Sequence, residues 1–292
     1  MLSHAAIVRL MRVARTPLAQ TSIRDALDSA LIALTAAGCD TPRLDAELLL
    51  ADAMGVDRAV IVSDPGRGLE PAQARRFQEH ARRRVQREPV AYILGMKGFR
   101  TIDLLVDPRV LIPRPETEHL VEAALDLPRG ARVADVGTGS GAVALALKAE
   151  RPDLDVIATD ASADALVVAR ANAQRLGLEV TLLEGDLLEP VDGPLDAVLS
   201  NPPYVADADR STLAPDITRH EPALALYAGP DGLSLIRRLV PAAAAAGAAL
   251  LALEVGFGQA EAVAAIVQEA GFADTEAIAD LAGIERVVVG RR

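Results

Sequence analysis

Residues 131–150 read ARVADVGTGSGAVALALKAE. The apolar run 132–136 has the residue types of a buried strand, and the apolar run from Ala142 has the composition of a helix. Between them, Gly137, Gly139 and Gly141 let the backbone turn tightly and approach a ligand with no Cβ in the way. The segment therefore predicts the first strand, turn and helix of a βαβ unit, with a ligand lying against bare backbone.

An acidic residue follows this loop at the spacing expected of a nucleoside-binding site. Asp160 lies about 20 residues beyond Gly141, at the end of the next apolar run, where a carboxylate can accept hydrogen bonds from both ribose hydroxyls. The glycine loop and Asp160 together predict an adenosine-type cofactor. Gly137, Gly139 and Ala142 also satisfy the dinucleotide pattern G-x-G-x-x-G/A, so the loop alone leaves NAD and S-adenosylmethionine both open.

From Glu116 onward, strand-like and helix-like runs alternate, which is typical of a parallel sheet covered on both faces. We predict strands at 132–136, 155–159, 179–183, 195–200, 249–255, 272–278 and 285–289, and helices near 116–127, 141–150, 163–176, 232–246 and 259–270. The last two strands follow each other directly, so they are expected to form an antiparallel pair. The predicted fold class is α/β and Rossmann-like, a seven-stranded, mostly parallel sheet with an antiparallel edge pair.

The chain before this sheet divides into three parts. Residues 1–21 contain three arginines and no acid, and we expect a disordered N-terminal extension, with a transit peptide as the alternative. Residues 22–88 show helical spacing in three runs, which predicts a small helical bundle. Residues 89–113 place Gly and Pro between short apolar runs and predict a β-hairpin linker. The α/β domain then occupies residues 114–292.

The third helical run, after Pro71, carries six arginines between Arg75 and Arg87. A charged run is usually a solvated helix face, and an acidic or RNA-containing partner is the sharper alternative.

The amino-acid composition excludes several classes of protein. With 51% hydrophobic and 24% charged residues, the 292-residue chain is neither disordered nor collagen-like, and its single Cys39 rules out a disulfide framework. The formal net charge is -11, distributed as +2 over residues 1–90 and -13 over residues 91–292. That balance argues against a protein whose main task is to grip nucleic-acid phosphates. No run of about 18 apolar residues occurs, so we expect no membrane span.

Two residues after the third predicted strand are candidates for the base of the nucleoside. Asp186 could accept a hydrogen bond from an adenine amine, and Leu187 could pack beside the ring. A solvated turn aspartate is the alternative, but the ligand edge of an open α/β sheet favours the first interpretation.

The segment Asn201-Pro202-Pro203-Tyr204 directly follows the apolar strand that ends at Ser200. Its two prolines withhold two backbone N–H groups, so the Asn201 side-chain oxygen and nearby carbonyls face the site as acceptors. Acceptors suit a planar amine or amide nitrogen about to be methylated, because they favour positive charge developing at nitrogen. Tyr204 can stack on the flat substrate group. The alternative is a rigid turn with no role in chemistry.

No other catalytic apparatus competes with this segment. The four histidines lack metal-ligand spacing, so we expect no metal site, and neither a G-x-S-x-G elbow nor a phosphate-binding G-x-x-x-x-G-K-[ST] loop occurs. Methyl transfer from a sulfonium needs in-line approach and desolvation rather than a metal or covalent nucleophile.

These residues resemble one known family, the peptide chain release factor N5-glutamine methyltransferases of the HemK type. The similarity covers most of residues 22–292. Its specific elements are EPVAYILG (88–95), Phe99, LIPRPETE (111–118), the loop 135–141, NPPY (201–204), HEP (220–222) and EVG (254–256).

The resemblance implies an S-adenosylmethionine-dependent enzyme that methylates the glutamine of the Gly-Gly-Gln tripeptide in release factors, with the helical bundle docking that protein. It implies that the loop Gly137, Thr138, Gly139, Ser140 and Gly141 holds the methionine end of the cofactor, Asp160 the ribose, and Asp186 with Leu187 the adenine side. Phe99 would pack near the cofactor, and Asn201 and Pro202 would grip the glutamine amide. We expect a cytoplasmic monomer with no stable nucleic-acid partner.

Two alternatives use similar chemistry. A methyltransferase acting on a ribosomal-protein glutamine would differ only in docking. An adenine-N6 methyltransferase also uses Asn-Pro-Pro-Tyr, but the acidic α/β domain and the lack of a base-reading module count against it.

The role of Arg114 has two interpretations. Arg114 either borders the site or holds the linker against the sheet through Glu118 or Glu221.

Overall fold

The computed structural model describes residues 21–292, and the predicted extension at 1–21 lies almost wholly outside the described residues. The chain forms two compact units, one ending at Leu94 and the other spanning Gly95–Arg292. None of the helices in the described part is long and apolar enough to cross a membrane.

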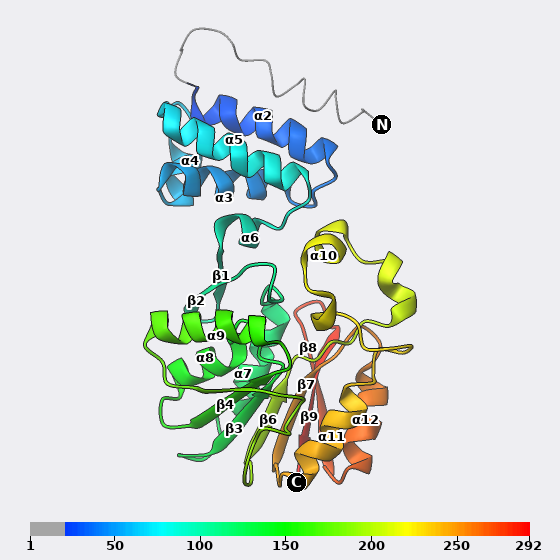
Figure 1. The fold of residues 1–292 in the computed structure, drawn as a ribbon. Coiled ribbons are helices and arrows are strands. Elements are labelled where there is room, and N and C mark those ends of the chain that lie inside the picture. Colours follow the sequence, from blue (N-terminus) through cyan, green and yellow to red (C-terminus); the bar gives the residue numbers. More distant parts are fainter. Residues whose placement is uncertain (1–20) are drawn as a thin grey trace. The chain divides into compact units, whose positions relative to one another are not determined.

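The first unit is a helical bundle (Figure 1). Its helices are α2 (Ile23–Ala36), α3 (Pro42–Met54), α4 (Arg58–Ser63), α5 (Pro71–Val85) and α6 (Val90–Leu94). Ser22 caps α2 through a capping box with Asp25, which satisfies backbone N–H groups at the helix start. Gly55 ends α3 with a φ of 66°, the left-handed conformation that glycine adopts without strain. The three long helices match the predicted runs, whereas the short α4 and α6 were not predicted.

Several arginines of helix α5 form ion pairs with acidic residues of the same unit instead of projecting into solvent. Arg84 is buried and donates to Asp45 on α3 at 2.7 Å. Arg83 pairs with Glu88, and Arg76 pairs with Asp52 at 2.9 Å. For Arg84 the solvated-face interpretation is therefore wrong, since its guanidinium is part of the bundle interior.

The second unit opens with the two-stranded hairpin of β1 (Met96–Phe99) and β2 (Ile102–Leu105). A seven-stranded sheet follows, in the order β5-β4-β3-β6-β7-β9-β8. Its strands are β3 (Arg132–Val136), β4 (Asp155–Asp160), β5 (Thr181–Glu184), β6 (Ala197–Ser200), β7 (Leu250–Glu254), β8 (Asp274–Ala279) and β9 (Glu285–Arg291). The predicted fold class is confirmed. Strand β9 runs antiparallel to both β7 and β8, so the antiparallel pair lies at one edge with β9 as its inner member.

Helices cover both faces of this sheet (Figure 1). The covering helices are α7 (Glu118–Ala124), α8 (Ala142–Glu150), α9 (Ala163–Leu176), α11 (Ile236–Ala245) and α12 (Ala260–Glu269). The short helix α10 (Pro215–His220) and the 3-10 turns η2 (Asp207–Ser211) and η3 (Ala223–Ala225) lie in the connection between β6 and α11, and the 3-10 turn η1 (Pro115–Thr117) directly precedes α7. Alternate residues of each central strand enter different core layers. Leu250 and Ala252 of β7 join the layer under α7 and α8, whereas Leu251 and Leu253 join the layer under α11 and α12. A strand buried on both faces therefore reads as a continuous apolar run.

Candidate active site

A cavity of about 220 Å³ lies in the second unit, where β3, β4 and β6 end. The carboxyl ends of parallel strands, at the point where the strand order reverses on either side of β3, are the usual ligand site of open α/β sheets. Ten of the sequence-predicted site residues line this cavity: Gly137, Thr138, Gly139, Ser140, Asp160, Asp186, Leu187, Asn201, Pro202 and Pro203. Gly141, Phe99 and Tyr204 are not among its lining residues.

The glycine loop presents bare backbone to the cavity. Gly137 and Gly139 have φ values of 73° and 56°, and a Cβ built on either would meet no atom within 4 Å. Both glycines therefore border open space that a ligand can enter. Gly141, with φ 85°, serves packing instead, because a Cβ there would lie 2.8 Å from Leu145 Cδ1 as α8 begins.

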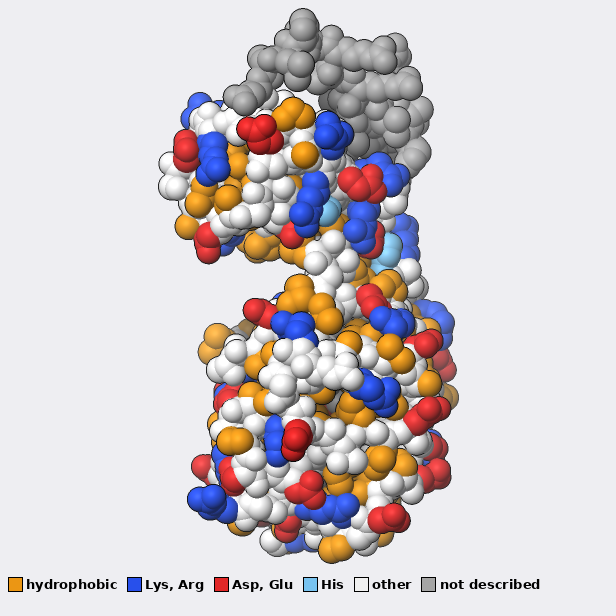
Figure 2. Space-filling view, turned by 60° about the vertical axis from the view of Figure 1, so that its left-hand side comes forward, with side chains coloured by type: hydrophobic (Ala, Val, Ile, Leu, Met, Phe, Trp, Pro, Cys, Tyr) orange, Lys and Arg blue, Asp and Glu red, His pale blue; other side chains and the backbone are white. Residues whose placement is uncertain are grey.

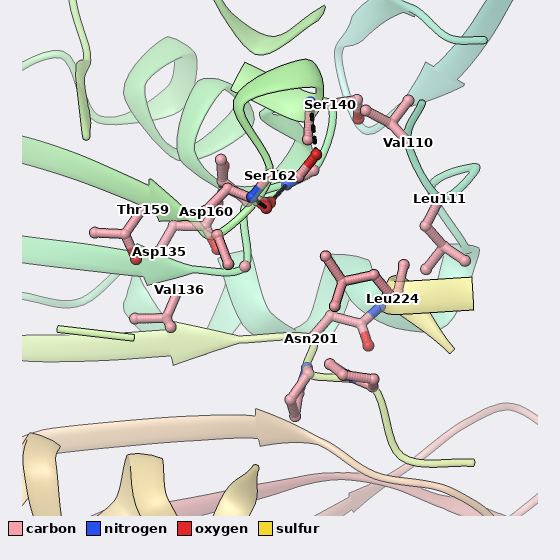
Figure 3. A pocket seen from close by; sticks show the side chains of 18 of the residues that line it. Val110, Leu111, Asp135, Val136, Ser140, Thr159, Asp160, Ser162, Asn201 and Leu224 are labelled. Atoms are coloured by element: carbon pink, nitrogen blue, oxygen red, sulfur yellow. Dashed lines mark hydrogen bonds between the residues drawn. The ribbon is translucent and has the colours of Figure 1, made fainter. Parts of the chain in front are cut away.

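Asp160 ends β4 and binds the glycine loop directly. Its Oδ2 accepts from the backbone N–H of Gly139 at 2.8 Å, and its Oδ1 accepts from that of Ser162 at 2.8 Å. Burial raises the pKa of this carboxyl, while the two backbone hydrogen bonds oppose the shift. Each carboxylate oxygen keeps acceptor capacity for a further donor such as a ribose hydroxyl. Figure 3 shows Asp160, Ser162 and Ser140 on one side of the cavity.

A second carboxylate supports the loop from beneath. Asp135 is buried, and its Oδ2 accepts from the Thr138 hydroxyl at 2.6 Å and from the backbone N–H of Ala144 at 3.1 Å. Burial raises its pKa to about 6. Asp135 thus holds the loop and the first turn of α8 together. The buried Ser140 Oγ has no hydrogen-bond partner among the described residues, which leaves it available to a ligand.

Asp186 and Leu187 border the cavity after β5. The Asp186 carboxylate forms an ion pair with the exposed Arg238 of α11, so it is not free to bind a base without rearrangement or sharing. Leu187 has a φ of 52°, an uncommon conformation for a branched residue, and its carbonyl oxygen accepts from the Thr159 hydroxyl at 2.8 Å. That hydrogen bond fixes Leu187 against the end of β4.

Asn201 follows β6 and lies on the other side of the cavity, next to Leu224 (Figure 3). Its Nδ2 donates to the Thr117 hydroxyl at 3.0 Å, and that hydroxyl donates to Glu254 Oε2 at 2.5 Å. Asn201 Oδ1 has no hydrogen bond within the described chain. The prolines Pro202 and Pro203 line the same wall and offer carbonyl oxygens without N–H groups.

Tyr204 and Phe99 lie away from the cavity wall. The Tyr204 hydroxyl donates to Glu254 Oε1 at 3.3 Å, and burial beside that carboxylate raises the Tyr204 pKa. Phe99 is 2% exposed within the core layer under α7 and α8. Stacking of Tyr204 on a substrate and contact of Phe99 with a cofactor therefore stay predictions.

The sequence assigned no role to Thr117 or Glu254, and the structure places both at or beside the site. Thr117 lines the cavity, and Glu254 ends β7 at 2% exposure, where burial raises its pKa to about 7. The signal for Glu254 is visible in hindsight, since it is an acid at the last position of an apolar strand, as Asp160 is. Arg114 pairs with the buried Glu221, which decides between the two partners considered for it.

The cavity chemistry and the fold agree with comparisons to known proteins. Residues 25–95 match the family model "PrmC N-terminal domain", and residues 116–225 match "Methyltransferase small domain". The catalytic domain of hMettl16, solved in complex with an RNA hairpin, superposes with a TM-score of 0.53 at 16% identity, covering 71% of this chain and 79% of that one. This last likeness concerns the fold alone. The match over residues 116–225 identifies a methyltransferase domain.

The family follows from curated relatives. The release factor glutamine methyltransferase of Deinococcus radiodurans is 45% identical over 80% of this chain and 86% of its own length. That of Geobacter sulfurreducens is 41% identical over 92% of this chain and 96% of its own length. The chain belongs to the release factor glutamine methyltransferase family.

Proposed function

We propose that this protein transfers a methyl group from S-adenosylmethionine to the side-chain amide nitrogen of the glutamine in the Gly-Gly-Gln motif of peptide chain release factors. The observation that carries the proposal is the meeting of two features in one cavity. One is the glycine loop with Asp160, and the other is an Asn201 amide held by its nitrogen, with its carbonyl oxygen left free.

The first wall fits the cofactor. Gly137 and Gly139 leave room against their backbone for the methionine end, and Asp160 keeps acceptor capacity for the ribose hydroxyls. Asp186 and Leu187 would border the adenine, with Phe99 supporting the site from the core. When bound, S-adenosylmethionine supplies an electrophilic methyl group on a sulfonium.

The second wall fits an amide acceptor. The lone pair of an amide nitrogen is delocalised, so attack requires positive charge to develop on a nitrogen that carries two hydrogens. Asn201 Oδ1 and the Pro202 carbonyl oxygen would accept from those hydrogens and stabilise that charge. The ring of Pro203 and the hydrogen bond from Tyr204 to Glu254 would keep the segment rigid. After the methyl group has moved to the nitrogen, that nitrogen is positively charged and one of its own two hydrogens can leave to solvent as a proton, so no side chain is assigned as a general base.

Charge supports a protein substrate over nucleic acid. On the face seen in Figure 2, basic side chains are interspersed with acidic ones over the larger unit instead of forming one basic field. The net charge of -13 over residues 91–292 agrees with that distribution. We propose that the helical bundle docks the release factor, and that the enzyme acts as a monomer in the cytoplasm.

The test is a mass-spectrometric methylation assay with S-adenosylmethionine. The acceptors are a purified release factor, its Gly-Gly-Gln to Gly-Gly-Ala variant, a ribosomal-protein fraction and an adenine-containing oligonucleotide. A gain of one methyl on the native release factor, absent from the variant, is the expected result. Methylation of only the oligonucleotide or only a ribosomal protein would overturn the proposed substrate while leaving the cofactor assignment intact.

A further inference from the structure

A chain of three side chains connects the interior of the sheet to the acceptor wall. Glu254 ends β7 and does not line the cavity, Thr117 lies in η1 and does, and Asn201 follows β6. The Thr117 hydroxyl is within 2.5 Å of Glu254 Oε2 and 3.0 Å of Asn201 Nδ2. Both Glu254 and Thr117 are nearly inaccessible, at 2% and 3% exposure, so water does not compete for these contacts.

The donors and acceptors of the hydrogen bonds that join Asn201, Thr117 and Glu254 follow from the chemistry of these side chains. A hydroxyl has one proton to donate, and a carboxylate can only accept. Since the Thr117 proton goes to Glu254, its oxygen must act as the acceptor toward Asn201. Asn201 therefore presents its NH2 group to Thr117 and its carbonyl oxygen to the cavity. The reverse amide orientation would place an NH2 donor opposite the NH2 of an amide substrate, and neither donor would have a partner.

The carboxylate itself is held in place by its second oxygen. Tyr204 donates to Glu254 Oε1 at 3.3 Å, so the tyrosine that follows Pro203 has a partner inside the protein. Among the charged groups facing Glu254, Arg114 lowers its pKa and Glu116 raises it, while Arg286 of β9 acts on Tyr204. Burial outweighs these charges and leaves the Glu254 pKa at about 7.

We propose that Glu254 and Thr117 are positioning residues that lock the Asn201 side-chain amide with its carbonyl oxygen turned toward the methyl acceptor, an inference that rests on the proposed function for the identity of that acceptor. Protonation of Glu254 would allow its Oε2 to donate to Thr117. The Thr117 hydroxyl could then donate a hydrogen bond to Asn201 instead of to Glu254. The Asn201 side-chain amide would no longer be held in a single orientation. The lock works only while Glu254 is charged.

The first experiment needs no substrate. The Asn201 side-chain NH2 signal is assigned in the ¹⁵N NMR spectrum of the full chain with S-adenosylmethionine, by its absence in Asn201→Ala. In the unmodified protein this signal is expected to shift with pH around a midpoint near 7. In Thr117→Val, which keeps the shape and removes the hydroxyl, the shift should vanish, whereas Thr117→Ser should retain it. A signal that Thr117→Val leaves at its position in the unmodified protein, or one that still titrates in Thr117→Val, overturns the lock.

The second experiment measures methylation of release factor from pH 6 to pH 8. Thr117→Val should lower kcat about tenfold at pH 8 with an unchanged S-adenosylmethionine Kd, while Thr117→Ser stays within about threefold of the unmodified enzyme. The advantage of the unmodified enzyme over Thr117→Val should shrink toward pH 6. A ratio that stays constant with pH, or equal losses in the Ser and Val variants, contradicts the inference. If the unmodified enzyme does not methylate the release factor, the proposed function fails, and the NMR result still decides the lock.

Discussion

The side-chain amide of Asn172 on α9 donates to the carbonyl oxygen of Ser140 in the glycine loop at 2.9 Å. The same amide donates to the Leu105 carbonyl at 3.0 Å and accepts from the Leu105 N–H at 2.7 Å. Asn172 is fully buried. One side chain thus joins the hairpin that opens the second unit to the loop proposed to hold the cofactor.

Replacing Asn172 by Ala should destabilise the second unit by about 2 to 4 kcal/mol, because it leaves backbone groups of Leu105 and Ser140 buried without partners. Urea unfolding measures this loss. The exposed neighbour Gln174→Ala on the same helix is the matched control and should change stability by less than about 0.5 kcal/mol. Equal effects of the two substitutions would mean that the Asn172 hydrogen bonds contribute no net stability.

The sheet was predictable because its strands are apolar runs bounded by turns. Three of them begin two residues later than predicted, at Thr181, Ala197 and Asp274. The ladders explain the first two, since Thr181 and Ala197 are the first residues with partners, on β4 and β3 respectively. A partner's position is not written in the local sequence. The short helices α4, α6 and α10 were missed because five or six residues are too few to show a period.

The site was predictable where its signal is local. The glycine loop, Asp160 and Asn201 each follow a predicted strand, and parallel strands bring such residues to one edge. Thr117 and Glu254 are 137 residues apart, and no spacing rule joins them. The same holds for Arg84 and Asp45, whose pairing depends on how α5 packs on α3.

Asp160→Ala should weaken S-adenosylmethionine binding by about 1.5 to 3 kcal/mol, the scale of hydrogen bonds to a charged group. Calorimetry measures the affinity directly. Asp155→Ala, at the opposite end of the same strand and outside the cavity lining, is the matched control and should leave the affinity unchanged. Unchanged affinity in Asp160→Ala would remove this residue from the proposed cofactor site.

The stability of the protein should depend on the protonation of Asp135. Its pKa of about 6 in the folded state lies above the ordinary value of an aspartate side chain, so the folded state binds the proton more tightly than the unfolded state. The resulting stabilisation is complete below about pH 4 and is lost as the pH rises through 6, a change of up to about 3 kcal/mol.

Asp135→Asn cannot titrate, and it keeps an oxygen that can accept from Thr138 and Ala144. The free energy of unfolding of the unmodified protein minus that of Asp135→Asn should therefore fall between pH 4 and pH 7. Urea unfolding of both proteins across this range measures the difference. A difference that is constant or rises with pH would show that Asp135 is not the group responsible.

Arg114 compensates a buried charge at Glu221, whose side chain is 1% exposed. Arg114→Met should destabilise the protein by about 2 kcal/mol at pH 7.5, because it leaves that carboxylate unpaired. Burial already raises the Glu221 pKa, and removing Arg114 should raise it further. The double variant Arg114→Met/Glu221→Gln should recover most of the loss, since no charge remains to be compensated. Urea unfolding of the four proteins gives the coupling energy, and additive losses would contradict a direct pairing.

Asn201→Ala tests the acceptor wall separately from the cofactor wall. The substitution removes the carbonyl oxygen proposed to bind the glutamine NH2, so turnover with release factor should fall by at least about 100-fold. The S-adenosylmethionine Kd should change by less than about threefold, because the glycine loop and Asp160 hydrogen bonds do not involve Asn201. Only one hydrogen bond of a half-buried side chain is lost, the one to Thr117, so thermal stability should change little. Near-normal turnover would show that another group accepts from the substrate, and loss of cofactor affinity equal to the loss of turnover would place Asn201 in the cofactor site instead.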